Sequence, residues 1–168
     1  MMRSLMTMMD IPINIIKDIL TETQRKKLIR DCQSFLKDWG PNTPALQTYS
    51  ELHNHSEFQD VIIRLASRSS EILGKTIRVK RSWINCDNGR REDILWHNHP
   101  EADYSLVYYI KTIPFINSGT RFKDKFVRVP QNGAMIFPSS VEHTAPSYPF
   151  SWIKRYSMAI DFKDETRS

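Results

Sequence analysis

The sequence predicts a mainly β fold that is preceded by helices, because the spacing of apolar residues changes near residue 74. Before Gly74, apolar side chains recur every three or four residues, as along a helix with one buried face. After it, short β-rich runs alternate with turn residues, as in a sandwich or barrel. The 168 residues suit a single domain. We divide it into a helical lead-in (1–74), a β core (75–163) and a tail (164–168).

Two helices are predicted in the lead-in, over residues 21–39 and 56–74. The first begins at Thr21-Glu22-Thr23-Gln24, which matches a capping box whose side chains bind the first backbone N–H groups. Gly40-Pro41 ends it, and Gly74 ends the second helix. Seven strands are predicted after that glycine, over residues 76–85, 94–98, 104–112, 120–129, 134–138, 142–145 and 152–162.

The composition excludes several classes of protein. The 24 Lys and Arg exceed the 19 Asp and Glu, but they are scattered and form no nucleic-acid motif, so we expect a solvated basic surface. Only Cys32 and Cys86 are present, which implies no disulfide framework and favours a reducing cytoplasm. No apolar run is long enough to span a membrane. Nothing in the sequence indicates an oligomeric state.

The first chemical signal is the pair His97 and His99 in the segment Trp96-His97-Asn98-His99-Pro100. Residues two apart on a strand point to the same face, so one metal ion could bind both. His143 is the other histidine of the strand-rich half and could complete a three-imidazole site. The pair His53 and His55 has the same spacing, but it lies in a polar loop, where we expect local hydrogen bonding only.

The second signal is Arg155 followed by Ser157 on the last predicted strand, where alternation places both on one face. An inward-facing Arg needs an anion, and its planar guanidinium binds a carboxylate through two parallel hydrogen bonds. The Ser hydroxyl can add a third. The alternative is a structural ion pair between Arg155 and a protein carboxylate such as Asp161 or Glu142.

With these residues in view, the chain resembles the non-haem iron, 2-oxoglutarate-dependent oxygenases, in particular a small bacterial and phage subgroup with an HxHP motif and prolyl-hydroxylase-like members. The resemblance covers about residues 83–162. It is carried by four segments, which are His97-Asn98-His99-Pro100, Ser105-Leu106-Val107-Tyr108-Tyr109, Phe137-Pro138-Ser139-Ser140 before His143, and Arg155-Tyr156-Ser157.

The resemblance implies a double-stranded β-helix, which is a jelly-roll core of cupin type, for residues 75–163. His97 and His143 would match the two family histidines, and Arg155 and Ser157 the pair that holds the distal carboxylate of 2-oxoglutarate. Tyr108 or Tyr104 would add a hydroxyl to the same anion.

His99 departs from this family, most of whose members have Asp or Glu two residues after the first histidine. Either His99 is the third ligand, or Glu101 or Asp103 supplies a carboxylate instead. We prefer His99 because its position matches residue for residue, whereas the two acidic residues follow Pro100 in a predicted turn.

The implied activity is Fe(II)- and 2-oxoglutarate-dependent hydroxylation with O2 as cosubstrate and release of succinate and CO2. The catalytic centre would be the metal held by His97, His99 and His143. The substrate would be a protein side chain, an amino acid or a small metabolite. Three residues near the site in sequence are candidates for contacting it, namely Trp83, Asn85 and Trp96.

Two other functions remain open at this stage. The histidines, with Pro138 near the last of them, also resemble the cupins, which include metal enzymes that use no 2-oxoglutarate; Ser140 replaces a cupin glycine. The second open function is a non-catalytic β-sandwich that binds a partner through its basic surface. It predicts no tightly bound metal.

Overall fold

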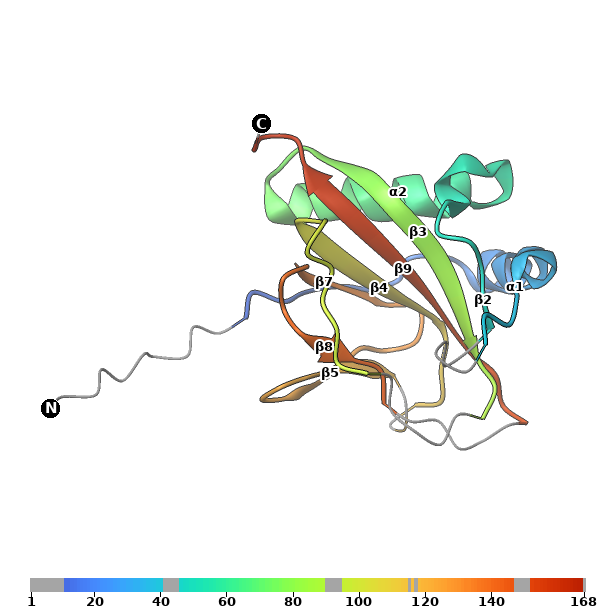
Figure 1. The fold of residues 1–168 in the computed structure, drawn as a ribbon. Helices are drawn as coiled ribbons and strands as arrows, with labels where there is room; N and C mark the ends of the chain where they lie inside the picture. The colour runs from blue at the N-terminus through green and yellow to red at the C-terminus, as the bar shows by residue number, and fades with distance from the viewer. Residues whose placement is uncertain are drawn as a thin grey trace, which may run out of the picture.

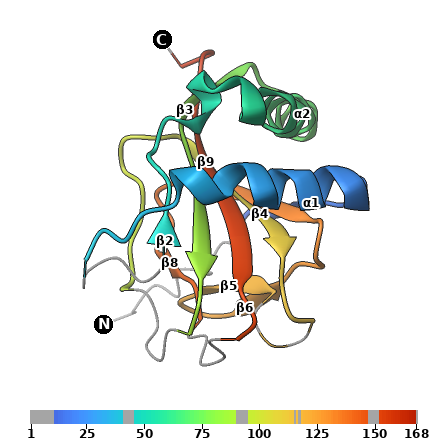
Figure 2. The same cartoon turned by 90° about the vertical axis from the view of Figure 1, so that its right-hand side faces the viewer.

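Two antiparallel β-sheets face each other, and two helices cover the outer face of the larger sheet (Figures 1 and 2). The computed structural model describes residues 11–40, 46–89, 95–114, 116, 118–146 and 152–167. The larger sheet has the strand order β1-β7-β4-β9-β3-β2, and the smaller has the order β6-β5-β8. The strands are β1 (Asn14–Ile16), β2 (Leu46–Gln47), β3 (Ile77–Asp87), β4 (Tyr104–Lys111), β5 (Gly119–Phe122), β6 (Phe126–Arg128), β7 (Ala134–Pro138), β8 (His143–Thr144) and β9 (Arg155–Asp164).

Helix α1 (Glu22–Asp31) begins as predicted. Gln24 N donates to Thr21 Oγ1 at 3.2 Å, and Thr21 N donates to Gln24 Oε1 at 2.9 Å, which confirms the capping box. The helix ends earlier than predicted: a 3-10 turn, η1 (Cys32–Phe35), follows, and Lys37 then pairs with Gln47 of β2. The backbone of Lys37 bonds to the edge strand β2 instead of continuing the helix, although the apolar spacing remains helical as far as Trp39.

Helix α2 (Ser56–Leu73) confirms the second predicted helix. It ends at Gly74, which has a positive φ of 62°, a conformation that glycine adopts without steric cost. A 3-10 turn, η2 (Leu52–Asn54), leads into it. No helix in the described part of the chain is long and apolar enough to cross a membrane.

The predicted strands are mostly confirmed, with two changes. The run 120–129 is divided into β5 and β6, and the described part of 94–98 contains only an isolated bridge at His97 instead of a strand. Residue 94 lies outside the described residues. The short strands β1 and β2 were not predicted, because two or three residues carry no usable alternation.

Two apolar cores lie on opposite faces of the larger sheet. The first packs the sheet against α1 and α2 and includes Phe58, Leu65, Ile84, Leu106, Met158 and Ile160. The second fills part of the space between the two sheets and includes Tyr109, Phe122, Val129, Met135 and Phe137. The central strands are therefore buried on both faces, so the polar residues on the inner face need partners there.

Strand β9 pairs with both β3 and β4. Every second residue of β9 lies on the inner face of the sheet, and most of these residues are polar. Four of its cross-strand pairs with β3 lie on the inner face, and we call them the β3–β9 ladder. They are Arg155 with Asp87, Ser157 with Asn85, Ala159 with Trp83, and Asp161 with Arg81. An ion pair therefore stands at each end of the ladder, with smaller or aromatic groups between.

Candidate metal centre and adjoining cavity

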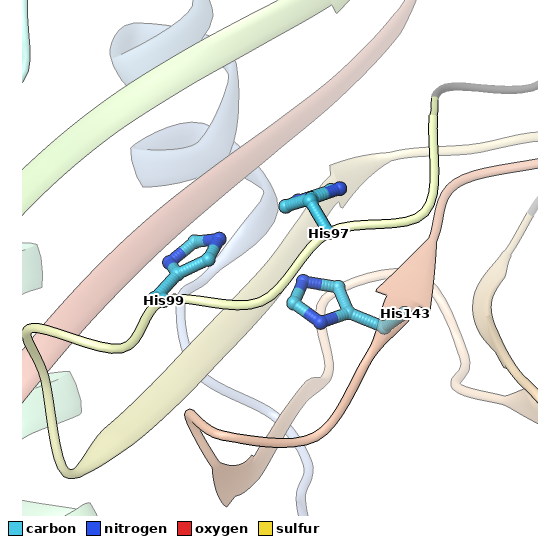
Figure 3. Close-up of side chains that lie close together, drawn as sticks. All are labelled: His97, His99 and His143. Carbon is cyan, nitrogen blue, oxygen red and sulfur yellow. The ribbon is translucent and has the colours of Figure 1, made fainter.

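Three imidazole rings converge beside the inner face of the larger sheet, from His97, His99 and His143 (Figure 3). The ring centroids are 5.3 Å apart for His97 and His99, 4.5 Å for His97 and His143, and 5.3 Å for His99 and His143. One nitrogen from each ring lies within 4.8 Å of the others. Among the described residues, this is the single group of histidine, cysteine and acidic side chains able to hold a metal ion.

The backbone fixes the relative positions of these rings. His97 N donates to His143 O at 3.2 Å, and His143 N donates to His97 O at 2.9 Å, so the first segment pairs directly with β8. His99 N donates to Ser139 O at 2.8 Å. Histidines that are distant in sequence are thus joined by main-chain hydrogen bonds, which leaves little freedom in their separation.

The Nδ1 atom of each ring has a hydrogen-bond acceptor. His97 Nδ1 donates to Leu95 O at 2.8 Å and His143 Nδ1 donates to Val141 O at 3.0 Å, because a carbonyl oxygen can only accept. The Nε2 atoms of these neutral rings are therefore the unprotonated ones, as metal ligation requires. The third ring, His99, places its Nδ1 atom 2.7 Å from Asp161 Oδ1.

Burial keeps two of the rings neutral near pH 7. It lowers the pKa of His143 to about 4 and outweighs the opposing effect of the hydrogen bond to Val141. Burial likewise lowers the pKa of His97. Neutral imidazole is the form that binds a metal, so no proton has to be displaced from these two ligands near pH 7.

Asp161 is fully buried at one end of the ladder, and its carboxylate contacts His99. Its Oδ1 atom accepts from Ser105 Oγ at 2.9 Å as well as facing His99, and its Oδ2 atom accepts from Arg81 Nη2 at 2.7 Å and Nε at 3.1 Å. Burial alone would raise the pKa of this carboxyl, but the hydrogen bonds from His99, Ser105 and Arg81 lower it below its usual range. Asp161 is therefore an ionised group in the interior.

A cavity of about 410 Å³ lies against the three imidazoles and the β3–β9 ladder. Arg155 and Asp87 also line it, and Arg155 Nη1 donates to Asp87 Oδ2 at 2.9 Å. Their side chains are only 4% and 2% exposed. The cavity is thus bordered by the histidines and by a buried guanidinium, which is the pair of features that the sequence predicted.

Most of the predicted site residues meet in this cavity. Its lining includes His97, His99, His143, Arg155, Ser157, Trp83 and Asn85. Trp83 also stacks on the His99 ring, with centroids 5.7 Å apart. Trp96 is not among the lining residues; it is 41% exposed, and Lys123 Nζ lies 5.5 Å from its ring centroid. Its predicted contact with substrate is not supported by this position.

The predicted placement of Tyr108 or Tyr104 beside the anion needs correction. Both pack in or against the core under the helices, and the Tyr108 hydroxyl donates to Asn132 Oδ1 at 2.9 Å. Because side chains alternate along β4, the residue on the inner face is Tyr109. Its buried hydroxyl lies 2.5 Å from Thr120 Oγ1, and the Arg155 guanidinium lies 5.4 Å from its ring centroid. Tyr109 could have been found from the sequence, because it is two residues after Val107 and four after Ser105, and alternate residues of a strand share a face.

The two alternative carboxylate ligands lie in other interactions. Glu101 Oε2 is 3.3 Å from Lys80 Nζ, and Asp103 Oδ2 accepts from Asp164 N at 2.9 Å. Neither belongs to the possible metal-binding group. This position of the acidic residues favours His99 as the third ligand.

The loop histidines make the local contacts that we expected. His53 Nδ1 lies 2.9 Å from Ser82 Oγ, and His55 packs edge-on against Phe35. They do not belong to the possible metal-binding group of the described residues.

Arg155 does form an ion pair with a protein carboxylate, but with a different one from those considered. Asp161 pairs with Arg81, and Glu142 Oε2 lies 2.9 Å from Lys123 Nζ. The partner is Asp87, directly opposite on β3. The sequence analysis missed Asp87 and Arg81 as site residues, because β3 also carries Arg78 and Lys80 and its charged residues gave no signal that separated the two kinds.

The facing sheets form the predicted double-stranded β-helix, and comparison with solved structures shows the same fold in 2-oxoglutarate enzymes. No family model matches the chain, and no curated protein matches it in sequence. One similar structure is SnoN, described as a non-haem α-ketoglutarate-dependent epimerase from nogalamycin biosynthesis, where α-ketoglutarate is 2-oxoglutarate. It is 11% identical with a TM-score of 0.77, over 93% of this chain and 79% of SnoN.

Two further structures have the same fold. HygX from Streptomyces hygroscopicus, solved with nickel and 2-oxoglutarate bound, is 10% identical with a TM-score of 0.68, over 92% of this chain and 84% of HygX. A prolyl hydroxylase from Trichoplax adhaerens, solved with a peptide fragment, is 14% identical with a TM-score of 0.64, over 92% of this chain and 84% of the hydroxylase.

Proposed function

We propose that this protein is an Fe(II)- and 2-oxoglutarate-dependent oxygenase, which uses O2 to hydroxylate a small molecule or a protein side chain and releases succinate and CO2. The observation that carries the proposal is that three imidazoles and the Arg155–Ser157 pair line one cavity. The fold shared with SnoN and HygX is consistent with it.

The donor set suits a divalent transition metal. Imidazole nitrogen is a good ligand for iron and nickel, and three ligands leave positions open for a chelating 2-oxo acid and O2. His97, His99 and His143 would hold the ion through Nε2, because each Nδ1 atom is engaged elsewhere. The bound iron would supply the activation of O2, which no protein side chain can perform.

The residues of the chain bind and orient the cosubstrate. A guanidinium has five N–H donors in a planar fork, so Arg155 can bind a ligand carboxylate while it also donates to Asp87. Ser157, two positions along the same face, can donate its hydroxyl to that carboxylate. The cosubstrate would lie between the imidazoles and Arg155, and the surrounding protein would exclude bulk water from it.

The substrate would enter beside the same ladder. Trp83 and Asn85 both line the cavity, and Trp83 stacks on the His99 ring. A substrate near the metal could therefore contact the indole of Trp83 and the amide of Asn85. HygX has been solved with hygromycin B and the Trichoplax enzyme with a peptide. Both kinds of substrate remain within the proposal.

The decisive experiment is an anaerobic titration of 2-oxoglutarate into the Fe(II)-loaded protein, followed through the visible charge-transfer band of a 2-oxo acid chelated to iron. A saturable band that is lost in His143→Ala and weakened in Arg155→Ala and Ser157→Ala is the expected result. Trp96→Ala is the matched control, because Trp96 does not line the cavity. Iron binding without a band would contradict the use of 2-oxoglutarate.

The second candidate is a cupin-type metal enzyme that uses no 2-oxoglutarate. The observation in its favour is the Arg155–Asp87 ion pair, which already gives the guanidinium a carboxylate. The same titration separates the two candidates, since a cupin would bind metal without the band. A wild-type protein that binds no metal would instead support a non-catalytic β-sandwich.

The proposed cellular location is the cytoplasm. Cys32 and Cys86 are both buried and both free. Free thiols are typical of a reducing compartment.

A further inference from the structure

The third histidine of the metal site differs from the other two in its hydrogen-bond acceptor. The Nδ1 atoms of His97 and His143 donate to the neutral carbonyl oxygens of Leu95 and Val141, each two residues earlier in the chain. His99 Nδ1 lies 2.7 Å from a carboxylate that is 62 residues away, that of Asp161. A carboxylate on the outer nitrogen makes an imidazole a more basic ligand and fixes its tautomer.

The Asp161 carboxylate is held by donors on the two neighbouring strands, β3 and β4. Ser105 lies opposite it on β4 and donates to Oδ1 at 2.9 Å, so that oxygen meets both Ser105 and His99. Arg81 lies opposite it on β3 and donates twice to Oδ2, at 2.7 and 3.1 Å. Asp161 itself is fully buried on the central strand β9. Both oxygens are therefore positioned by backbone register, and the carboxylate cannot turn away from His99 without breaking these bonds.

Charge gives this contact a further role. Three neutral imidazoles bring no negative charge to a divalent cation, and a buried cation needs compensation in a medium of low dielectric constant. Asp161 places a carboxylate one ring away from the metal position. Arg81 balances the charge of this carboxylate from the other oxygen, and its side chain is 36% exposed.

We propose that Asp161 is a positioning residue of the metal site, which fixes His99 with Nε2 toward the ion and lends negative charge to that ligand, while Arg81 and Ser105 hold it in place. This inference rests on the metal site of the proposed function and does not depend on the use of 2-oxoglutarate. His99 would then be the strongest donor of the three ligands.

The test is the affinity of the metal-free protein for Ni(II), measured by calorimetry without turnover. Asp161→Asn keeps the shape of the side chain and removes the charge, and it should weaken Ni(II) binding by about 10- to 100-fold, the usual effect of losing such a partner. Asp103→Asn is the matched control: it removes a carboxylate whose contacts are Asp164 N and Lys163, not a histidine. Its Ni(II) affinity should change by less than about threefold.

A second readout separates positioning from general destabilisation. The nitrogen NMR shifts of His99 in the metal-free protein should report the Nδ1–H tautomer in wild type and a mixture of tautomers in Asp161→Asn. If that variant does not fold because Arg81 is left unpaired, the double variant Arg81→Gln/Asp161→Asn removes both charges and should show the same loss of affinity.

Three results would overturn the inference. One is a folded Asp161→Asn variant that binds Ni(II) within about threefold of wild type. Another is an equal loss of affinity in Asp103→Asn. A wild-type protein that binds no Ni(II) would remove both the metal site and this inference, whereas Ni(II) binding without a 2-oxoglutarate band on iron would remove only the oxygenase proposal.

Discussion

Asp87 Oδ2 lies 2.9 Å from Arg155 Nη1, across the pairing of β3 with β9, and both side chains are buried. The guanidinium proposed to bind 2-oxoglutarate is therefore also half of a structural ion pair. Removing Arg155 alone changes two things at once, the anion site and the compensation of a buried carboxylate. Experiments on Arg155 have to separate these effects.

Arg155→Ala should destabilise the protein by about 3 to 5 kcal/mol, because it leaves the Asp87 carboxylate buried without this cation. Urea unfolding of the metal-free protein measures this. The double variant Asp87→Ala/Arg155→Ala should recover most of the lost stability, but not the affinity for 2-oxoglutarate. Recovery of both would show that Arg155 acts only through the fold, and a loss of affinity below about threefold in the single variant would remove its proposed role.

The stability of the metal-free protein should fall as the pH falls from about 6.5 to about 4. Burial holds the pKa of His143 at about 4 in the folded state, so between these values the unfolded chain binds a proton that the folded chain does not. At about 1.4 kcal/mol per pKa unit, this group contributes about 3 kcal/mol, fully present above pH 6.5. Urea unfolding at several pH values checks it, and His143→Gln should reduce the dependence to the part that the lowered pKa of His97 contributes.

Glu101→Ala should leave metal binding unchanged within about threefold, because this side chain is 70% exposed and faces Lys80. Elemental analysis of the purified variant, together with Ni(II) calorimetry, provides the measurement. His99→Ala is the comparison that should lose the metal. If Glu101→Ala loses metal instead, the third ligand is a carboxylate.

Gly119→Ala should destabilise the smaller sheet. A methyl group at this position would meet the Val127 carbonyl oxygen and lie 2.7 Å from Phe126 Cζ, and φ is +154°. We expect a cost of about 2 kcal/mol or more in urea unfolding. The same strand pairs Phe122 with His143, so Ni(II) affinity should fall as well. Gly74→Ala, which has a positive φ but open space around it, should cost less; an equal cost would show that the contacts are not decisive.

Features set by nearby residues could be predicted from the sequence. The capping box at Thr21, the end of a helix at Gly74 and the shared face of Arg155 and Ser157 each depend on a few neighbouring residues or on simple alternation. The choice of His97 and His99 over the loop pair also followed from local context. The capping box and the helix end are confirmed, and Arg155 and Ser157 line the same cavity, whereas the choice of ligand pair stays a prediction.

Features set by strand register could not be predicted. That Asp87 faces Arg155, or that Asp161 faces Arg81, depends on which residues of β3 and β9 lie opposite each other. The partners are 68 and 80 residues apart in the chain. The sequence analysis proposed Tyr108 or Tyr104 and did not consider Tyr109, because it did not establish that Tyr109 lies opposite Ser157 on the inner face of the sheet. The two-residue strand β2 exists only because β3 offers it an edge.

The mutual hydrogen bonds of His97 and His143 join the segment before β4 to β8 of the smaller sheet, at the place where the metal would bind. An ion held by these histidines would crosslink the two segments, and its binding free energy would stabilise the folded chain against unfolding. Chelators should therefore make the protein more sensitive to proteases. Mutations that weaken the pairing of these two segments should lower the affinity for metal even where they change no metal ligand.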